Sequence, residues 1–412
     1  MDKKKFITVM FPYPSGSGLH IGHWYNYAIV DSYCKLQKYQ GYEVYQPFGY
    51  DAFGLPAENY ARKVGRDPKE VTYENIGNFQ KEMKRMNTSY ETKLITSDPQ
   101  YVQKTQSLFK KLLSKGLAYK AFRAENFCPS CDTVIAKEQV KNDCCERCNT
   151  KVEKKELEQW FFKITDYRER LIKDLDKVDY PEKTKKQQIH WLQEDKFTDW
   201  CVSRQRKWGC PIPVEGETDT LDTFVDSSFY TIEYDNKRPV DIYVGGNEHA
   251  CMHLIYARFI CKFLYDIGDI DFDEPFNKVI HQGMILGEDG EKMSKTRGNV
   301  ILPDNYDPQL LRIYLMFINH YFEGGKWQDN GYKGCEKFRN KLITWLGNTN
   351  STGLSDFENI FAAFKLKVIN YFESWKTNKV VSEWMIFVNS HKSFNLTKEQ
   401  SELIFEFFNV CF

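Results

Sequence analysis

Two histidines near the N-terminus follow a glycine-rich turn, in an arrangement that can handle phosphate groups. Gly16 and Gly18 let the backbone come close to a phosphate, and a predicted helix beginning near His20 points its free N–H groups at the same place. His20 and His23 are three positions apart, so they share one helix face and can donate hydrogen bonds to a triphosphate. The alternative is a capped helix that carries two polar surface histidines.

A second candidate segment lies far downstream, in the run Lys292-Met293-Ser294-Lys295-Thr296. Small and polar residues flank the two lysines, which is typical of a mobile loop. Such a loop can close over a substrate and neutralise departing pyrophosphate. An isolated pair of lysines at this spacing would otherwise be read as a solvated basic loop.

Two Cys-x-x-Cys pairs form a third candidate site. They are Cys128 with Cys131 and Cys145 with Cys148. Four thiolates in hairpin pairs suit tetrahedral zinc and leave no open position, which favours a structural metal. Cys144 is adjacent, so the third ligand can be displaced by one position, and reduced cysteines without a metal are the alternative.

The composition is that of an ordinary globular protein. The chain has 412 residues, with 42% hydrophobic and 28% charged residues, enough for two to four domains. Lys+Arg and Asp+Glu both total 57, and this zero net charge neither requires nor excludes a nucleic-acid partner. With no apolar run of membrane length and no signal-peptide core, we expect a cytoplasmic protein whose twelve cysteines are thiols or metal ligands.

The elements that must position these residues follow from hydrophobic spacing. Residues 5–10 predict a strand, residues 20–40 a helix that stops at Gly41, and residues 44–47 a second strand. A strand, a helix and a strand at this spacing predict a βαβ unit and a parallel sheet. The other predicted segments are a mostly helical region over 67–120, a mixed region over 197–330 with a strand running into glycines at 240–246, and a helical tail from about 331.

The order and separation of the two phosphate-handling segments resemble the HIGH and KMSKS signatures of class I aminoacyl-tRNA synthetases. Thr296 replaces the usual serine and keeps the hydroxyl. Within this class, several segments are most similar to leucyl-tRNA synthetase, and the similarity covers nearly the whole chain. These segments are 10–16, 49–59, 156–161, 203–213, 222–230 and 245–250.

The resemblance implies an α/β fold, with a split Rossmann-like parallel sheet, an inserted zinc-ribbon module and an α-helical C-terminal bundle. The implied domains are 1–127 as the first half of the catalytic domain, 128–195 as a connective insertion with the zinc module, 196–330 as the second catalytic half, and 331–412 as a shortened anticodon-binding-like bundle. The chain stops before the next segment expected in the family, so an incomplete bundle with exposed apolar faces is expected.

The resemblance also assigns roles to individual residues. By similarity, Asp51 holds the ammonium of leucine, and His20, His23, Lys292 and Lys295 stabilise the charge that develops on ATP. The leucine pocket would comprise Phe11, Tyr13, Asp51, Phe224, Ser227, Tyr230 and His253. ATP would contact Gly16, Gly18, His20, His23, Gly245, Gly246, Glu248, His249, Met293 and Lys295. Phe224, Tyr230 and His253 can instead be ordinary core residues.

The predicted activity is therefore that of a leucine–tRNA ligase that uses ATP and Mg²⁺, acts on tRNA(Leu), carries a structural zinc ion and is a monomer. Family members usually carry an editing domain after a Trp-Ile-Gly segment, yet here Ile189–Leu192 is followed almost at once by Phe197–Cys201. We expect activation of isoleucine, methionine or norvaline without hydrolysis of the mischarged product. The alternatives are a paralogue that adenylates an amino acid for another acceptor, and a non-catalytic leucine- or RNA-binding protein.

Overall fold

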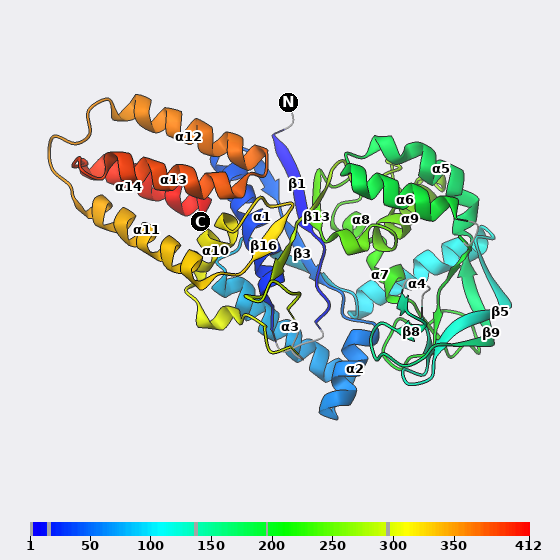
Figure 1. Cartoon of the computed structure of the whole chain (residues 1–412). Helices are drawn as coiled ribbons and strands as arrows, with labels where there is room; N and C mark the ends of the chain where they lie inside the picture. The colour runs from blue at the N-terminus through cyan, green and yellow to red at the C-terminus, as the bar shows by residue number, and fades with distance from the viewer. Residues whose placement is uncertain (1–2, 15–17, 136–138, 195–196, 294–296) are drawn as a thin grey trace.

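The centre of the molecule is a four-stranded parallel sheet in the order β14-β13-β1-β2 (Figure 1). β1 (Lys4–Val9) pairs with β2 (Glu43–Tyr45) on one side and with β13 (Ile242–Gly245) on the other, and β13 pairs with β14 (Val279–His281). The strands come from two distant parts of the chain, which confirms the split parallel sheet. The structure is a computed structural model that describes residues 3–14, 18–135, 139–194, 197–293 and 297–412.

The sheet separates two hydrophobic cores. In β1, Ile7 and Val9 belong to one core and Phe6 to the other, because successive side chains of a strand point to opposite faces. The helices α1 (Ile21–Tyr39) and α10 (Pro308–Phe317) contribute to the first core, and α9 (His253–Asp266) contributes to the second. Both faces of β1 are buried, as expected of a strand in a parallel sheet.

The structure corrects two predicted elements. The strand predicted over 44–47 is two short strands, β2 and β3 (Pro47–Tyr50), and β3 pairs in parallel with β4 (Glu91–Ile95). β4 interrupts the region predicted as mostly helical. It was missed because its residues are mainly polar and at least partly exposed, so no alternating apolar pattern marks it. The helices of this region are α2 (Leu55–Val64), α3 (Pro68–Arg85) and α4 (Pro99–Ser114).

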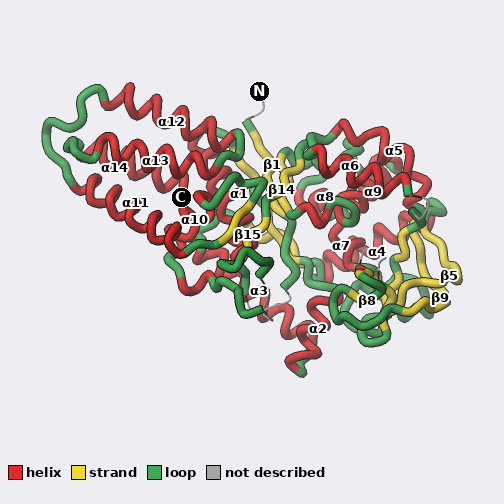
Figure 2. The backbone as a smooth tube through the Cα atoms, in the orientation of Figure 1, coloured by secondary structure: helices red, strands yellow, loops and turns green. Residues whose placement is uncertain are grey.

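A long antiparallel ribbon carries the cysteine pairs. β5 (Ala118–Cys128) pairs with β9 (Glu153–Phe162) along its length, and β10 (Trp200–Cys201) pairs with the end of β9. In Figures 1 and 2 the ribbon lies at the opposite end of the molecule from the C-terminal helices. The short strands at its tip are β6 (Thr133–Val134), β7 (Val140–Lys141) and β8 (Cys144–Cys145).

Short elements connect the ribbon to the second half of the sheet. Among them, α6 (Glu182–Gln193) and α7 (Thr223–Ser227) bear on function. The others are α5 (Arg168–Lys173), β11 (Ser203–Arg204), β12 (Thr220–Leu221), α8 (Tyr230–Tyr234) and the 3₁₀ helices at Ile164–Tyr167 and Asp174–Lys177. Further 3₁₀ helices follow β13 at Asn247–His249 and β14 at Pro303–Asn305.

The C-terminal region is helical, as predicted. Its helices α11 (Asp329–Gly347), α12 (Phe357–Glu373), α13 (Thr377–His391) and α14 (Lys398–Cys411) pack around buried aromatic side chains and against α1 and α10. The chain ends inside this core, since Phe412 is buried. One large apolar side chain per helix remains at least half exposed: Ile343, Leu366, Ile386 and Phe405. The pair β15 (Met284–Leu286) and β16 (Gly324–Lys326) joins the bundle to the sheet.

None of the helices in the described ranges combines the length and the hydrophobicity that a membrane span requires.

Candidate active site and metal centre

The two histidines cap the first turn of α1 with their own side chains. His20 is the N-cap residue, and its Nδ1 accepts hydrogen bonds from the backbone N–H of Gly22 at 3.0 Å and of His23 at 3.4 Å. The Nδ1 atom of His23 accepts from the His20 N–H at 3.2 Å. The expectation that these N–H groups are free for phosphate is therefore wrong for Gly22 and His23, because a reciprocal capping box already satisfies them.

The capping bonds fix the protonation of both rings. Each Nδ1 accepts a hydrogen bond, so in the neutral ring the proton lies on Nε2, which remains available as a donor. The rings of His20 and His23 stack with centroids 3.7 Å apart. Desolvation lowers the pKa of His20, and the nearby Lys292 ammonium lowers it further. Burial lowers the pKa of His23 well below its usual value. The pair therefore presents neutral N–H donors near neutral pH.

The glycine before this helix is not required by the fold. A Cβ added at Gly18 would meet no described atom within 4 Å, and Gly18 is exposed. The protein therefore leaves room for a side chain at Gly18, and a glycine at such a position is consistent with the close approach of a ligand to the backbone. Gly16 lies outside the described residues.

The second basic segment faces the histidines. Lys292 is exposed and close enough for its charge to affect His20. Among the described residues around it, the Asn299 amide donates hydrogen bonds to Asp289 at 3.0 and 3.1 Å, and Met293 packs against the first core. Lys295 falls outside the described residues, so its position remains a prediction.

Asp51 is a buried carboxyl group with one free oxygen. Its Oδ1 accepts a hydrogen bond from the Thr223 hydroxyl at 2.8 Å, whereas its Oδ2 has no hydrogen-bond partner among the described residues. Its backbone N–H donates to the Pro12 carbonyl at 3.0 Å, which joins the ends of β1 and β3. Burial raises the pKa of Asp51 to about 8, the Thr223 bond opposes the shift, and the Asp222 charge adds to it. None of the described residues forms an ion pair with Asp51, and a buried carboxylate needs such a cationic partner to be stable.

The predicted pocket aromatics are close together. Phe11 stacks on Tyr230 with centroids 3.9 Å apart, so a ligand side chain must lie beside this pair and not between the rings. Tyr13 lies near Asp51, and burial followed by the Asp51 charge raises its pKa. Phe224 and Ser227 lie on α7, next to Thr223, and both are buried.

His253 has a hydrogen-bond partner in the core. Its Nε2 lies 2.7 Å from the Tyr243 hydroxyl, which is also hydrogen-bonded to Tyr230. Burial lowers the pKa of His253 to about 3, so the ring is neutral. His253 is thus linked to Tyr230 through the Tyr243 hydroxyl, and a direct role of His253 in the leucine pocket remains a prediction.

The carboxyl end of β13 forms a further edge of the site. A Cβ at Gly245 would lie 2.1 Å from Met10 Sδ, so only glycine permits this close approach. Beyond Gly246, the Glu248 side chain is 73% exposed and lies 4.0 Å from His249 Nε2. Ligands of open parallel sheets bind at the carboxyl ends of the strands, which is where these residues lie.

Two residues without an assigned role in the sequence analysis also bear on this region. Thr223 orients Asp51, and His281 contacts the Gly245 carbonyl through Nδ1 at 2.8 Å, while its buried Nε2 has no partner among the described residues. The run 281–284, just upstream of the Lys292 segment, also fits the synthetase pattern, so a signal for His281 was present in the sequence. The contact of Thr223 with Asp51 joins positions far apart in the chain, and no local pattern marks it.

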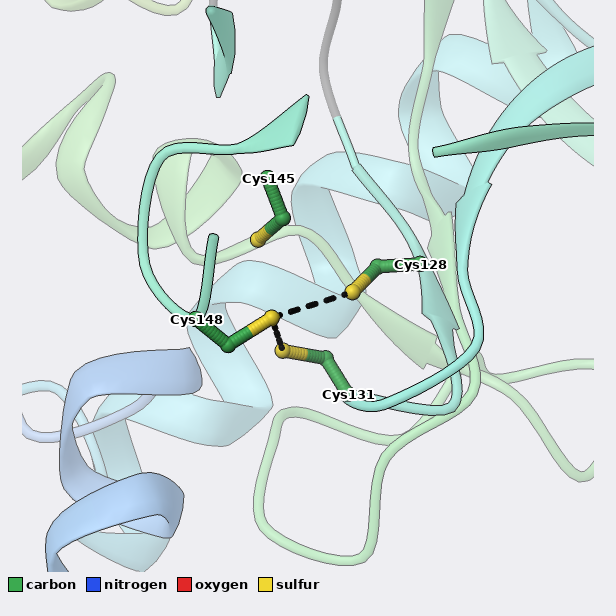
Figure 3. Close-up of side chains that lie close together, drawn as sticks. All are labelled: Cys128, Cys131, Cys145 and Cys148. Carbon is green, nitrogen blue, oxygen red and sulfur yellow. Dashed lines mark hydrogen bonds between the residues drawn. The ribbon is translucent and has the colours of Figure 1, made fainter. Parts of the chain in front are cut away.

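The four predicted cysteines converge at the tip of the ribbon (Figure 3). Their sulfur atoms all lie within 4.8 Å of one another, and Cys148 Sγ is 3.4 Å from Cys128 Sγ and 3.5 Å from Cys131 Sγ. Cys144 is outside this cluster. Four sulfurs at such distances can hold one tetrahedral soft cation, since a Zn–S bond of about 2.3 Å places neighbouring sulfurs slightly under 4 Å apart.

The cysteine cluster is tied to the candidate active site. Leu55, at the start of α2, packs against the cysteines, and Arg62 of the same helix lies 3.4 Å from the Ser130 carbonyl. Since α2 follows Asp51 almost directly, the ribbon tip and the Asp51 segment are mechanically connected.

Comparison with known proteins gives the class and then the family. The model for tRNA synthetases class I (I, L, M and V) matches residues 1–240 and 225–324, so this chain is an aminoacyl-tRNA synthetase of class I. The leucine–tRNA ligase of Clostridium kluyveri is 32% identical over 637 residues, covering 92% of this chain and 78% of the relative. That of Clostridium perfringens is 30% identical, covering 97% and 82%. The chain belongs to the leucine–tRNA ligase family.

Solved structures agree with this assignment. The structure of Agrobacterium radiobacter LeuRS in a ternary complex with tRNA and LeuAMS matches with a TM-score of 0.83 and 25% identity, covering 94% of this chain and 80% of the other. A Mycobacterium tuberculosis methionyl-tRNA synthetase in complex with methionyl-adenylate matches with a TM-score of 0.77 and 18% identity, covering 94% and 82%, and shows a shared fold.

Proposed function

We propose that this protein activates leucine with ATP and transfers it to tRNA(Leu). The observation that carries the proposal is the convergence of a neutral histidine pair and a buried, partly unpartnered Asp51 at the carboxyl ends of β1 and β3. The leucine carboxylate attacks the α-phosphorus of ATP, the bond to the β-phosphate oxygen breaks, and pyrophosphate leaves. A terminal ribose hydroxyl of tRNA then attacks the adenylate and releases AMP.

In this mechanism the chain contributes positioning and charge stabilisation. Asp51 binds the leucine ammonium, and the Nε2–H groups of His20 and His23 donate to phosphate oxygens as charge develops. Lys292 and Lys295 neutralise the departing pyrophosphate. Mg²⁺, when bound, supplies further charge neutralisation at the phosphates.

The test is ATP–pyrophosphate exchange with leucine, isoleucine, valine and methionine in parallel, followed by charging of tRNA(Leu). Exchange that is strongest with leucine, together with charging, supports the proposal. Exchange without charging would favour a paralogue with another acceptor. A folded protein that catalyses no exchange would favour a binding protein.

We further propose that the enzyme lacks post-transfer editing. The aligned span of 637 residues with the Clostridium kluyveri enzyme exceeds the full length of this chain, so the relative carries internal segments without a counterpart here. Direct pairing of β9 with β10 and the short link from α6 to Trp200 support the placement of one such gap after Gln193.

The absence of editing predicts stable mischarged products. Pocket discrimination of one methylene gives about 10- to 200-fold selectivity, so activation of norvaline, which has one methylene fewer than leucine, should be measurable. We expect measurable activation of the isomer isoleucine as well. Isoleucyl-tRNA(Leu) incubated with the enzyme should deacylate at the rate seen without enzyme. If the enzyme accelerated this deacylation tenfold or more over the rate measured without enzyme, the proposal would be contradicted.

The cysteine cluster is proposed to hold structural zinc. We expect about one zinc ion per chain in metal analysis, as for a four-thiolate site. Replacement C148S should reduce the zinc content to near zero and lower the melting temperature, since metal binding stabilises such modules. The matched control is C144S, which leaves the cluster intact and should retain the metal. If C144S lost as much zinc as C148S, Cys144 would be a ligand, and the assignment of Cys145 in its place would be wrong.

A further inference from the structure

One exposed face of α6 is cationic and is not used by the proposed chemistry. Lys183, Lys186 and His190 lie three and four positions apart and therefore share a helix face. Together with Gln187 they line a hollow on the surface of the protein. We call these four residues the α6 face. In Figure 1, α6 lies beside α9, on the side of the sheet away from the C-terminal bundle.

Two of the three basic residues of this face form no ion pair with a described acid, whereas His190 Nε2 lies 3.5 Å from Glu194 Oε1. Lys185, which points elsewhere, pairs with Asp176 at 2.8 Å, and Asp179 pairs with Lys278 at 2.8 Å. By contrast, Lys183 and Lys186 are exposed and form no ion pair with a described residue. The helix therefore keeps one neutralised lysine and presents two others to solvent.

The hollow also contains an unsatisfied polar atom. The Oε1 atom of Gln187 is buried and has no hydrogen-bond partner among the described residues. Gln187 directly follows Lys186 in the sequence, and it lines the same hollow. A phosphate oxygen would accept from the N–H₂ group of this amide, because Oε1 is itself an acceptor.

The α6 face adjoins the edge of the site that we assign to the nucleotide. The Thr184 hydroxyl lies 3.4 Å from Asn247 Oδ1, and Cys251 Sγ lies 3.6 Å from the Gln187 carbonyl. Asn247 begins the 3₁₀ turn that carries Glu248 and His249. Burial lowers the pKa of His281, and the Lys183 charge adds to this effect, which places Lys183 near the end of β14.

We propose that the α6 face binds backbone phosphates at the acceptor end of tRNA and so guides the terminal ribose to the adenylate. This inference rests on the proposed tRNA-charging function. The terminal nucleotide must reach the adenylate, so the phosphates that precede it must pass close to the same edge of the sheet. Two unpaired lysines one helical turn apart match a polyanion with regularly spaced charges, and phosphate contacts position a nucleic acid without reading its sequence.

The test compares the double variant K183A/K186A with the wild type, using a purified tRNA(Leu) transcript. We expect the tRNA KM in charging to rise at least tenfold at moderate salt, while leucine-dependent pyrophosphate exchange stays within about twofold. Loss of two phosphate contacts should also reduce the slope of log affinity against log salt by about 1.4–1.8. Unchanged exchange serves as the check that the double variant is folded.

The matched control is K185A, which removes the same charge from the same helix but from a lysine already paired with Asp176. It should leave the tRNA KM and the salt slope near the wild-type values. A double variant that charges tRNA with wild-type KM and salt slope would overturn the inference while leaving the function intact. If the wild type exchanges but charges no tRNA, the proposed function itself fails and the inference fails with it.

Discussion

Replacement D51N is expected to abolish leucine-dependent pyrophosphate exchange and, at the same time, to stabilise the free protein. Breaking a buried ion pair costs about 3–5 kcal/mol, so the exchange efficiency kcat/KM for leucine should fall by about 10²–10³-fold or more. Asparagine keeps the shape of Asp51 and can still accept the Thr223 hydrogen bond, but it offers no charge to the leucine ammonium.

The gain in stability follows from the raised pKa. Asp51 has a pKa of about 8 in the folded protein and about 3.9 in an unfolded chain, so the folded state binds one more proton between these values. Stability is therefore lost as the pH rises from about 4 to 8, and by pH 7 the loss is at most roughly 4 kcal/mol. D51N removes this loss, and its melting temperature at pH 7 should exceed that of the wild type.

The same shift predicts a pH-dependent leucine KM. The ionised form of Asp51 is needed for the ammonium, and it is the minor form of the free protein below pH 8. The leucine KM should fall about tenfold from pH 6 to pH 7, because the ionised fraction rises by that factor. A flat profile over this range would show that the free protein already holds Asp51 ionised.

The control for this prediction is D226N. Asp226 is another buried carboxyl with a raised pKa caused first by burial, and its Oδ1 accepts from Thr105 at 2.9 Å while its Oδ2 has no described partner. It has no proposed contact with the substrate. D226N should share the gain in stability and retain exchange. Equal loss of exchange in both variants would assign the D51N effect to the fold and not to ammonium binding.

Replacement H20N is expected to reduce the kcat of exchange by about 10²–10³-fold with little change in melting temperature. Asparagine is among the best N-cap residues, so it can accept the Gly22 and His23 N–H bonds that His20 Nδ1 now accepts. It cannot place a donor where the His20 Nε2–H lies. The measurement is steady-state exchange together with thermal unfolding.

The companion variant H20A separates capping from catalysis. It should show the same loss of rate plus a loss of about 1 kcal/mol of stability, because alanine cannot cap α1. If H20N exchanges at the wild-type rate, then His20 acts only as a helix cap. That outcome would support the alternative in which His20 is a polar residue that caps the helix. His23 and Lys292 would then be the described groups that act on the phosphates.

The sequence predicted the central βαβ unit because its signals are local. An apolar run before a proline- and glycine-rich turn, followed by helical spacing up to Gly41, is enough to predict β1 and α1. β4 was missed for the opposite reason. Its pairing with β3 depends on a partner distant in sequence, and its own residues carry no apolar alternation.

The cysteine cluster shows the same division. Two Cys-x-x-Cys spacings predicted the ligand type and the role, but the sequence left Cys144 and Cys145 as alternatives. The β8 hairpin decides between them, because adjacent residues of a strand point to opposite sides and only Cys145 faces the other three sulfurs.

By itself, the sequence predicted the candidate groups for the reaction, which are two histidines, a pair of lysines and a carboxylate, and it predicted a separate cluster of four cysteines. The tertiary structure decided the state in which the described groups act. Reciprocal capping sets the Nε2–H form of His20 and His23, and burial beside Thr223 leaves one oxygen of Asp51 without a partner. Such states depend on desolvation and on hydrogen bonds between distant segments, which local sequence patterns do not record.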